Sequence, residues 1–193
     1  MTFKIGHTTV SIAFSFSAVL CILLTAFPFS VVMQVLAAIL LHELGHLLCG
    51  ALFGVLPSRV ALSVRGVGIA MDLSGLPGRR RIAIAIAGPA LNLALCVPAA
   101  LFHLHAWMAV NGALAVLNLL PVPGLDGGDA LRIFLGRYVD CARADKVCLI
   151  VGFLVLFPAA SAYFLLLLGG LISHRSLLVF AYLVVLMFSD PPD

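Results

Sequence analysis

The sequence predicts an all-α integral membrane protein, a bundle of about six transmembrane helices with a short membrane-edge β-hairpin after the second helix. Of its 193 residues, 63% are hydrophobic and only 10% are charged, whereas soluble domains carry about 25% charged residues. The apolar residues also fall into runs close to the roughly 17–25 residues that a spanning helix needs. No stretch is long and polar enough to form a soluble domain, so we expect residues 1–193 to form a single membrane-embedded domain.

Six apolar units follow one another along the chain. The fourth is too short to cross a membrane alone, and becomes long enough only if the chain continues through the proline-rich turn 121–124 and resumes as a helix. Pro158 predicts a kink in the fifth unit. The units are expected at residues 10–27, 31–55, 81–102, 107–120 resumed by 127–137, 146–168 and 176–188.

The basic residues are distributed unevenly about these units. With six spans, every lysine and arginine except Arg175 falls on one side of the membrane. Cytoplasmic loops are enriched in these residues, so we expect both termini to be cytoplasmic and the first span to be retained. The net charge of +3 does not predict a nucleic-acid partner, because the basic residues occupy short loops between apolar runs.

Residues 59–72 differ from the apolar runs around them. They are rich in β-branched residues and glycine and partly alternate in polarity, which predicts a hairpin turning near Arg65 and Gly66. The edge of such a hairpin could hold an extended peptide by strand addition. An ordinary re-entrant loop remains the alternative.

Two histidines and one glutamate, His42, His46 and Glu43, interrupt the second apolar run. Insertion of one charged residue at the centre of a spanning helix costs about 2.5–3.5 kcal/mol, so a simple anchor would not contain them. On a helix the two histidines project from one face, about 5–6 Å apart at Cβ, where neutral imidazoles can share a metal ion. Glu43 can reach a metal-bound water without being a ligand. This is the H-E-x-x-H arrangement of zinc peptidases.

A catalytic zinc site takes three protein ligands and keeps a fourth position for water, so a third ligand is needed. The best candidate is Asp126, in the stretch 118–128. Its prolines break the helix and its glycines allow tight turns, and such irregular backbone is tolerated at membrane depth only inside protein or beside a wet cavity. The alternative is that Asp126 caps the following helix, a role for which Asp129 competes.

Three motifs now stand in order: 42–46 (His-Glu-Leu-Gly-His), 88–92 (Gly-Pro-Ala-Leu-Asn) and 118–128 (Asn-Leu-Leu-Pro-Val-Pro-Gly-Leu-Asp-Gly-Gly). Together they resemble the site-2 protease family (M50) of intramembrane zinc metalloproteases, over roughly residues 4–136. The short chain, its N-terminal span and the lack of a PDZ insertion resemble the compact bacterial branch that includes the sporulation pro-sigma-factor processing proteases. Residues 1–193 would be one metalloprotease domain without a PDZ or CBS domain.

The resemblance implies a role for each motif residue. One Zn²⁺ per chain would be bound by His42, His46 and Asp126, and Glu43 would activate water. Asn92 would contact the substrate backbone or the oxyanion, although a polar residue that bonds between helices is the alternative. The implied activity is hydrolysis of a peptide bond in a membrane-associated or transmembrane protein, as in regulated intramembrane proteolysis.

The resemblance also implies the surroundings of the enzyme. It would be a multi-pass protein of a bacterial cell membrane, with the lipid bilayer and a membrane-protein substrate as partners. A regulatory membrane partner or a homo-oligomer stays open, as do the substrate and its cut site.

Two other functions fit parts of the pattern. A metal transporter would need acidic or histidine residues along several spans, and outside the motifs these are nearly absent. A non-catalytic relative would have lost the glutamate or a ligand, and all are present. Cys49 is expected to pack rather than bind metal. His103, His105 and His174 fall in outer loops, where hydrated histidines are common.

Overall fold

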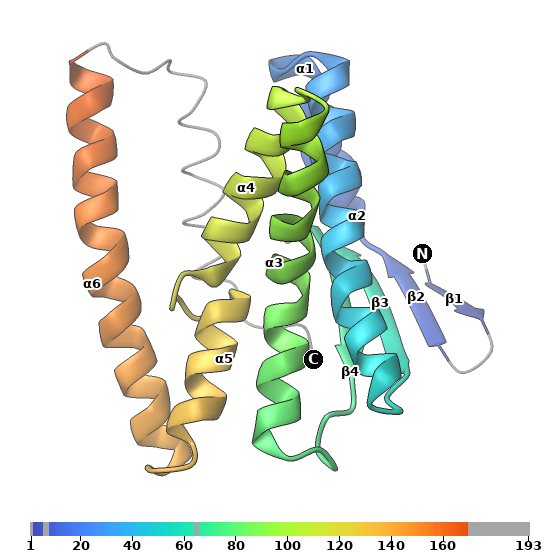
Figure 1. Ribbon diagram of the computed structural model, residues 1–193, viewed down its shortest axis with the longest axis vertical. Coiled ribbons are helices and arrows are strands. Elements are labelled where there is room, and N and C mark those ends of the chain that lie inside the picture. Colours follow the sequence, from blue (N-terminus) through green and yellow to red (C-terminus); the bar gives the residue numbers. More distant parts are fainter. Residues whose placement is uncertain (1, 6–7, 64–65, 170–193) are drawn as a thin grey trace. The chain divides into compact units, whose positions relative to one another are not determined.

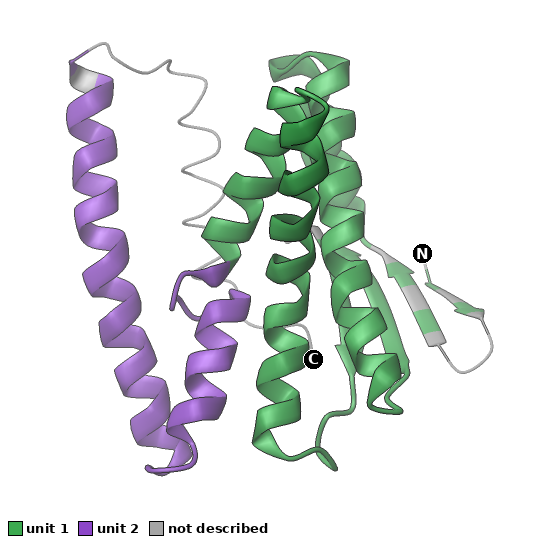
Figure 2. Cartoon of the chain, viewed as in Figure 1, with its two compact units in different colours: residues 1–118 green, residues 119–193 purple. Residues whose placement is uncertain are grey.

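The computed structural model describes residues 2–5, 8–63 and 66–169. Within these ranges the chain forms six helices and four strands (Figure 1). It divides into two compact units, residues 1–118 and 119–193 (Figure 2). The helices are α1 (Phe14–Ala26), α2 (Phe29–Leu52), α3 (Gly78–Leu101), α4 (His105–Leu119), α5 (Asp126–Leu135) and α6 (Cys141–Leu168).

Three of the described helices, α2, α3 and α6, are long and apolar enough to cross a membrane. They correspond to the second, third and fifth predicted units. As predicted, α4 is short, with 15 residues, and the chain resumes as a helix at Asp126. The sixth predicted unit, with His174 and Arg175, lies outside the described residues. The fold class, a mostly helical membrane protein with a small sheet, is confirmed.

The first unit contains a four-stranded sheet in the order β1-β2-β3-β4. Strands β3 and β4 pair antiparallel and form the predicted hairpin, while β2 runs parallel to β3 and antiparallel to β1. The strands are β1 (Thr2–Ile5), β2 (Thr8–Ile12), β3 (Pro57–Ser63) and β4 (Gly66–Met71).

The two N-terminal strands correct the start of the first predicted span. Residues 10–12 belong to β2, and α1 begins only at Phe14. The stretch from Thr8 to Ile12 is rich in β-branched residues, which favour strands, and β3 offers it an edge to pair with. The helix that follows has 13 residues instead of the expected 18.

Helices α2 and α3 pack closely in the first unit because glycines meet where they cross. A Cβ atom added to Gly45 of α2 would lie 2.6 Å from the carbonyl oxygen of Ala87 and 3.0 Å from the Cα of Gly88. Small residues at a crossing allow the backbones of two membrane helices to approach. The crossing therefore brings α3 against the turn of α2 that carries the histidine motif.

Candidate metal site

Helix α2 presents His42 and His46 on its buried face. Their side chains are only 5% and 8% exposed, and Ala38 and Gly45 are buried on the same face. The opposite face carries the exposed residues Leu40, Leu44 and Leu48. The i, i+4 spacing predicted from the sequence thus places both imidazoles inside the first unit, where α3 packs against α2.

The hydrogen bond of His46 determines its tautomer. Its Nδ1 lies 2.8 Å from the backbone carbonyl oxygen of Ile84, on α3. A carbonyl oxygen can only accept, so Nδ1 of the neutral ring carries the proton and donates. The lone pair of the ring is then on Nε2, the atom that a metal ion would bind.

The same argument applies to His42, whose Nδ1 lies 2.8 Å from Oδ1 of Asn92. The orientation of this amide is set by its other end, because Nδ2 of Asn92 donates to the carbonyl oxygen of Ala38 at 3.2 Å and to Oδ1 of Asn111 at 2.8 Å. The amide oxygen therefore faces His42 and accepts the Nδ1 proton. The lone pair of neutral His42 is also on Nε2.

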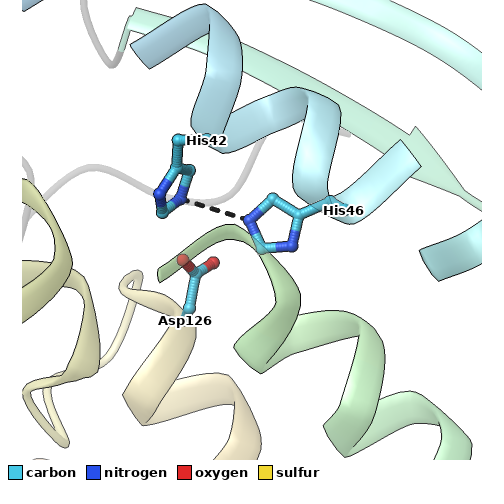
Figure 3. Close-up of side chains that lie close together, drawn as sticks. All are labelled: His42, His46 and Asp126. Carbon is cyan, nitrogen blue, oxygen red and sulfur yellow. Dashed lines mark hydrogen bonds between the residues drawn. The ribbon is translucent and has the colours of Figure 1, made fainter. Parts of the chain in front are cut away.

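The two Nε2 atoms face each other at 3.2 Å, with the rings edge to face (Figure 3). In these neutral tautomers neither Nε2 carries a proton, so two lone pairs point at a common region. Two nitrogens that bind one zinc ion tetrahedrally at about 2.0–2.1 Å stand about 3.4 Å apart. The observed separation therefore fits a shared zinc ion.

Gly88 of α3 leaves the space that such an ion requires. A Cβ atom at this position would lie 2.4 Å from Nε2 of His46 and 2.8 Å from Nε2 of His42. No side chain larger than that of glycine fits beside these two nitrogen atoms. The backbone of α3 thus forms one wall of the candidate site.

Asp126 belongs to the second unit, where it is the first residue of α5. The N-cap position is occupied by Leu125 and has no side-chain cap, so Asp126 is not the capping residue. Asp126 is half-buried, whereas Asp129 is exposed. The N-cap position, for which the sequence left the two carboxylates in competition, is therefore held by neither of them.

Close backbone contacts shape the segment before Asp126. A Cβ atom at Gly127 would lie 2.3 Å from the carbonyl oxygen of Leu119, and one at Gly128 would lie 2.0 Å from that of Val122. Gly124 has a φ of 86°, a conformation that L side chains rarely adopt. The glycines of the motif are therefore required by the turn that leads to Asp126.

The structure also gives the exposure of the other residues that the sequence singled out. Glu43 follows His42 on α2 and is half-buried, as is Cys49. His103 and His105 are exposed, and His105 is the first residue of α4.

Sequence reasoning missed Asn111 and the role of Gly88. Asn111 is an amide inside the apolar helix α4 and is 0% exposed. A polar residue inside an apolar helix was a signal for it. No sequence signal indicated that Gly88 lies against both imidazoles, because that depends on how two helices cross.

Comparison with known proteins identifies the family. The model of "Peptidase family M50" matches residues 97–159. The protein Rip2 of Mycobacterium tuberculosis is 32% identical over 191 aligned positions, which cover 72% of this chain and 73% of Rip2. The chain belongs to peptidase family M50. Membership of this family, together with the apolar helices, makes it an integral membrane protein.

Other relatives are more distant or longer. Zinc metalloprotease MJ0392 of Methanocaldococcus jannaschii is 28% identical over 160 positions, which cover 77% of this chain. The chain spans only 36% to 49% of the length of three curated relatives, among them Stage IV sporulation protein FB of Bacillus subtilis at 49%.

The fold is also that of a solved protein structure. The site-2 protease from Methanocaldococcus jannaschii matches with a TM-score of 0.68 and 23% identity, over 96% of this chain and 91% of that one. At this identity the match shows the fold alone.

Proposed function

We propose that this chain is an intramembrane zinc metalloendopeptidase that hydrolyses a peptide bond of a membrane-associated or transmembrane protein, as in regulated intramembrane proteolysis. The observation that carries the proposal is the pair of imidazoles on α2, whose Nε2 lone pairs face each other at 3.2 Å beside a glycine. Membership of a peptidase family supports the same chemistry.

One Zn²⁺ would be held by His42, His46 and Asp126. Two imidazole nitrogens and one carboxylate oxygen are a donor set that could hold a metal ion, and they suit a catalytic zinc site with an open fourth position. The tautomers of both histidines support this assignment, because each presents an Nε2 lone pair. When bound, the zinc would lower the pKa of a water molecule and polarise the scissile carbonyl group.

Glu43 would act as the general base. It follows the first histidine ligand on the same helix, so it would take a proton from the attacking water and then deliver it to the leaving amine. The half-buried position of its side chain is compatible with contact to a water molecule in the site.

Asn92 was expected to contact the substrate or the oxyanion. Contact with the oxyanion requires a donor, and both protons of its amide are accounted for by Ala38 and Asn111. The oxyanion role stays a prediction that requires the amide to change partners. We propose that the main role of Asn92 is to orient His42 through the bond to Nδ1.

The substrate would bind as an extended strand beside the sheet. Strand β4 ends the sheet, with β3 as its one strand neighbour among the described residues. Its last residue, Met71, approaches α2 at Gly50, where an added Cβ would lie 2.8 Å from Sδ of Met71. This contact is one turn of helix after His46, so a peptide added to β4 would run near the candidate site.

The protein would lie in a bacterial cell membrane with both termini cytoplasmic. The distribution of basic residues supports this orientation. The lipid bilayer and a membrane-protein substrate would then be its partners. Transport of a metal ion is less well supported, because the described residues carry no second group of His, Cys, Asp and Glu that could hold one.

A Glu43→Gln variant tests the enzymatic proposal. Glutamine keeps the size and polarity of the side chain but cannot take the proton of water, so peptide cleavage should fall by about 10²–10⁴-fold while the zinc content stays unchanged. The measurement is mass spectrometry of new chain termini in membranes from cells that express either form. Fragments that end inside a transmembrane segment should appear only with the wild type. Cleavage that persists in the variant would remove Glu43 from the base role.

A further inference from the structure

We propose that Asn111 of α4 is a positioning residue of the metal site, which acts through Asn92 to hold His42 in its metal-binding tautomer. This inference rests on the proposed zinc site. It extends that site to a third helix of the first unit, through a residue that touches neither histidine in the hydrogen bonds described.

A continuous series of hydrogen bonds links Asn111 to His42, and each bond has an assigned direction. Nδ2 of Asn111 donates to the carbonyl oxygen of Trp107 at 2.9 Å, which turns its Oδ1 toward Asn92. That oxygen accepts from Nδ2 of Asn92 at 2.8 Å, and Oδ1 of Asn92 accepts from Nδ1 of His42 at 2.8 Å. The direction of every bond follows from the carbonyl group of Trp107, which can only accept.

The two amides in this series are both 0% exposed. Water is therefore not available to replace a lost partner, and a buried polar group without a hydrogen bond is costly. A residue kept only for packing between apolar helices would not need an amide. The burial of both side chains indicates that the hydrogen bond between Asn92 and Asn111 has a role of its own.

The link matters because an asparagine amide has two orientations. If Asn92 were turned by 180°, its NH₂ group would face Nδ1 of His42 and donate to it. The ring would then carry its proton on Nε2 and present no lone pair to a metal ion. Oδ1 of Asn111 accepts only when Nδ2 of Asn92 points toward it, so Asn111 favours the orientation that leaves the lone pair on Nε2.

The test measures the zinc affinity of the purified full chain in detergent. Asn111→Leu keeps a similar volume and removes the acceptor. Loss of an outer partner of a metal ligand typically costs about 10–100-fold in metal affinity, and we expect a loss in this range. With Co²⁺ bound in place of zinc, the visible absorption spectrum of Asn111→Leu should also differ from that of the wild type, since the orientation of His42 would be altered.

The matched control is Cys96→Ala. Cys96 lies on α3, and its Sγ contacts the carbonyl oxygens of Asn92 on α3 and Met108 on α4. The substitution therefore removes a contact between these two helices but leaves both amide side chains intact. This variant should bind zinc like the wild type. If it weakened zinc binding as much as Asn111→Leu, the effect would be one of helix packing and the inference would be wrong.

A double variant shows whether Asn111 affects zinc binding through Asn92 or independently of it. If Asn111 acts through Asn92, the variant with both Asn92→Leu and Asn111→Leu should bind zinc no more weakly than Asn92→Leu alone. Losses that multiply would contradict the inference, because contributions by separate routes are expected to add in free energy.

Asn111→Asp keeps the inference testable if the leucine variant does not fold. A buried, protonated aspartate can accept from Asn92 and donate to Trp107, so its zinc affinity should stay within a few-fold of the wild type. An affinity as low as that of a variant at Asn92 would overturn the inference. A wild-type protein that binds no zinc would refute the proposed function itself, which is a different outcome.

Discussion

At the scale of single residues, the site depends on the direction in which each imidazole presents its lone pair. A histidine motif on a helix supplies two rings on one face, but not the tautomer of either ring. The carbonyl oxygen of Ile84 and the amide of Asn92 supply it, because each accepts the Nδ1 proton. Partners of this kind orient metal ligands and raise their basicity.

Gly88 gives a direct test at this scale. In Gly88→Ala, the new Cβ would lie within 2.4 Å and 2.8 Å of the two Nε2 atoms and would displace at least one ring. We expect zinc affinity to fall by at least about 10-fold, as when a metal ligand loses its orientation. Zinc titration of the purified protein measures this loss.

Gly112→Ala is the matched control for that substitution. It adds the same methyl group to a helix of the same unit, where its nearest neighbour is Sγ of Cys96 at an ordinary 3.8 Å. Unchanged zinc binding is expected. If Gly88→Ala also bound zinc normally, the region beside the two Nε2 atoms would not be the metal position.

The residue motif could be predicted from the sequence, but its supporting partners could not. His42, Glu43 and His46 are recognisable because polar residues are expensive inside an apolar run and because four-residue spacing places two of them on one face. The contacts of Gly88 and Asn111 depend on the distance between helices, which no local pattern contains. Asn111 had only its polarity to mark it.

At the scale of elements, the second unit is organised around the proline-rich segment before α5. Val122 is 2% exposed, and Ala144, Cys148 and Gly152 are buried along one stripe of α6. Gly152 meets the segment directly, because a Cβ atom there would lie 2.9 Å from Cδ of Pro123. Helix α6 therefore supports the turn that carries Asp126.

Gly152→Val tests this support. The added side chain would collide with the proline-rich segment, and overpacking of this kind typically costs about 1–3 kcal/mol. The purified protein should unfold at a lower temperature than the wild type. Ala159→Val, at an exposed position of the same helix, should change the unfolding temperature little. Equal effects of the two variants would show that α6 does not pack on the segment through Gly152.

Elements were predictable to the extent that their signals are local. The apolar runs of α2, α3 and α6, the break at the prolines and the hairpin of β3 and β4 were all expected. Strand β2 was not expected, since it pairs with β3 across a long separation in sequence and its apolar residues continued those of the first helix. Pairing with a distant strand decided the structure of residues 10–12.

At the scale of the whole molecule, the chain has the fold of a solved site-2 protease and belongs to peptidase family M50. Composition alone indicated a membrane protein, and three motifs in order indicated the family. What the sequence left open is whether Asp126 binds metal or caps α5, and in the structure the N-cap of α5 is Leu125. The half-buried position of Asp126 supports it as the third ligand.

The most direct test of the central proposal is the zinc content of the purified protein with Asp126→Asn, compared with Asp129→Asn and the wild type. Asparagine keeps the shape of aspartate but removes the charge that favours a divalent cation. The proposal predicts about one zinc ion per chain in the wild type and in Asp129→Asn, and strong loss in Asp126→Asn. Full zinc content in Asp126→Asn, or loss only in Asp129→Asn, would contradict the proposed ligand set.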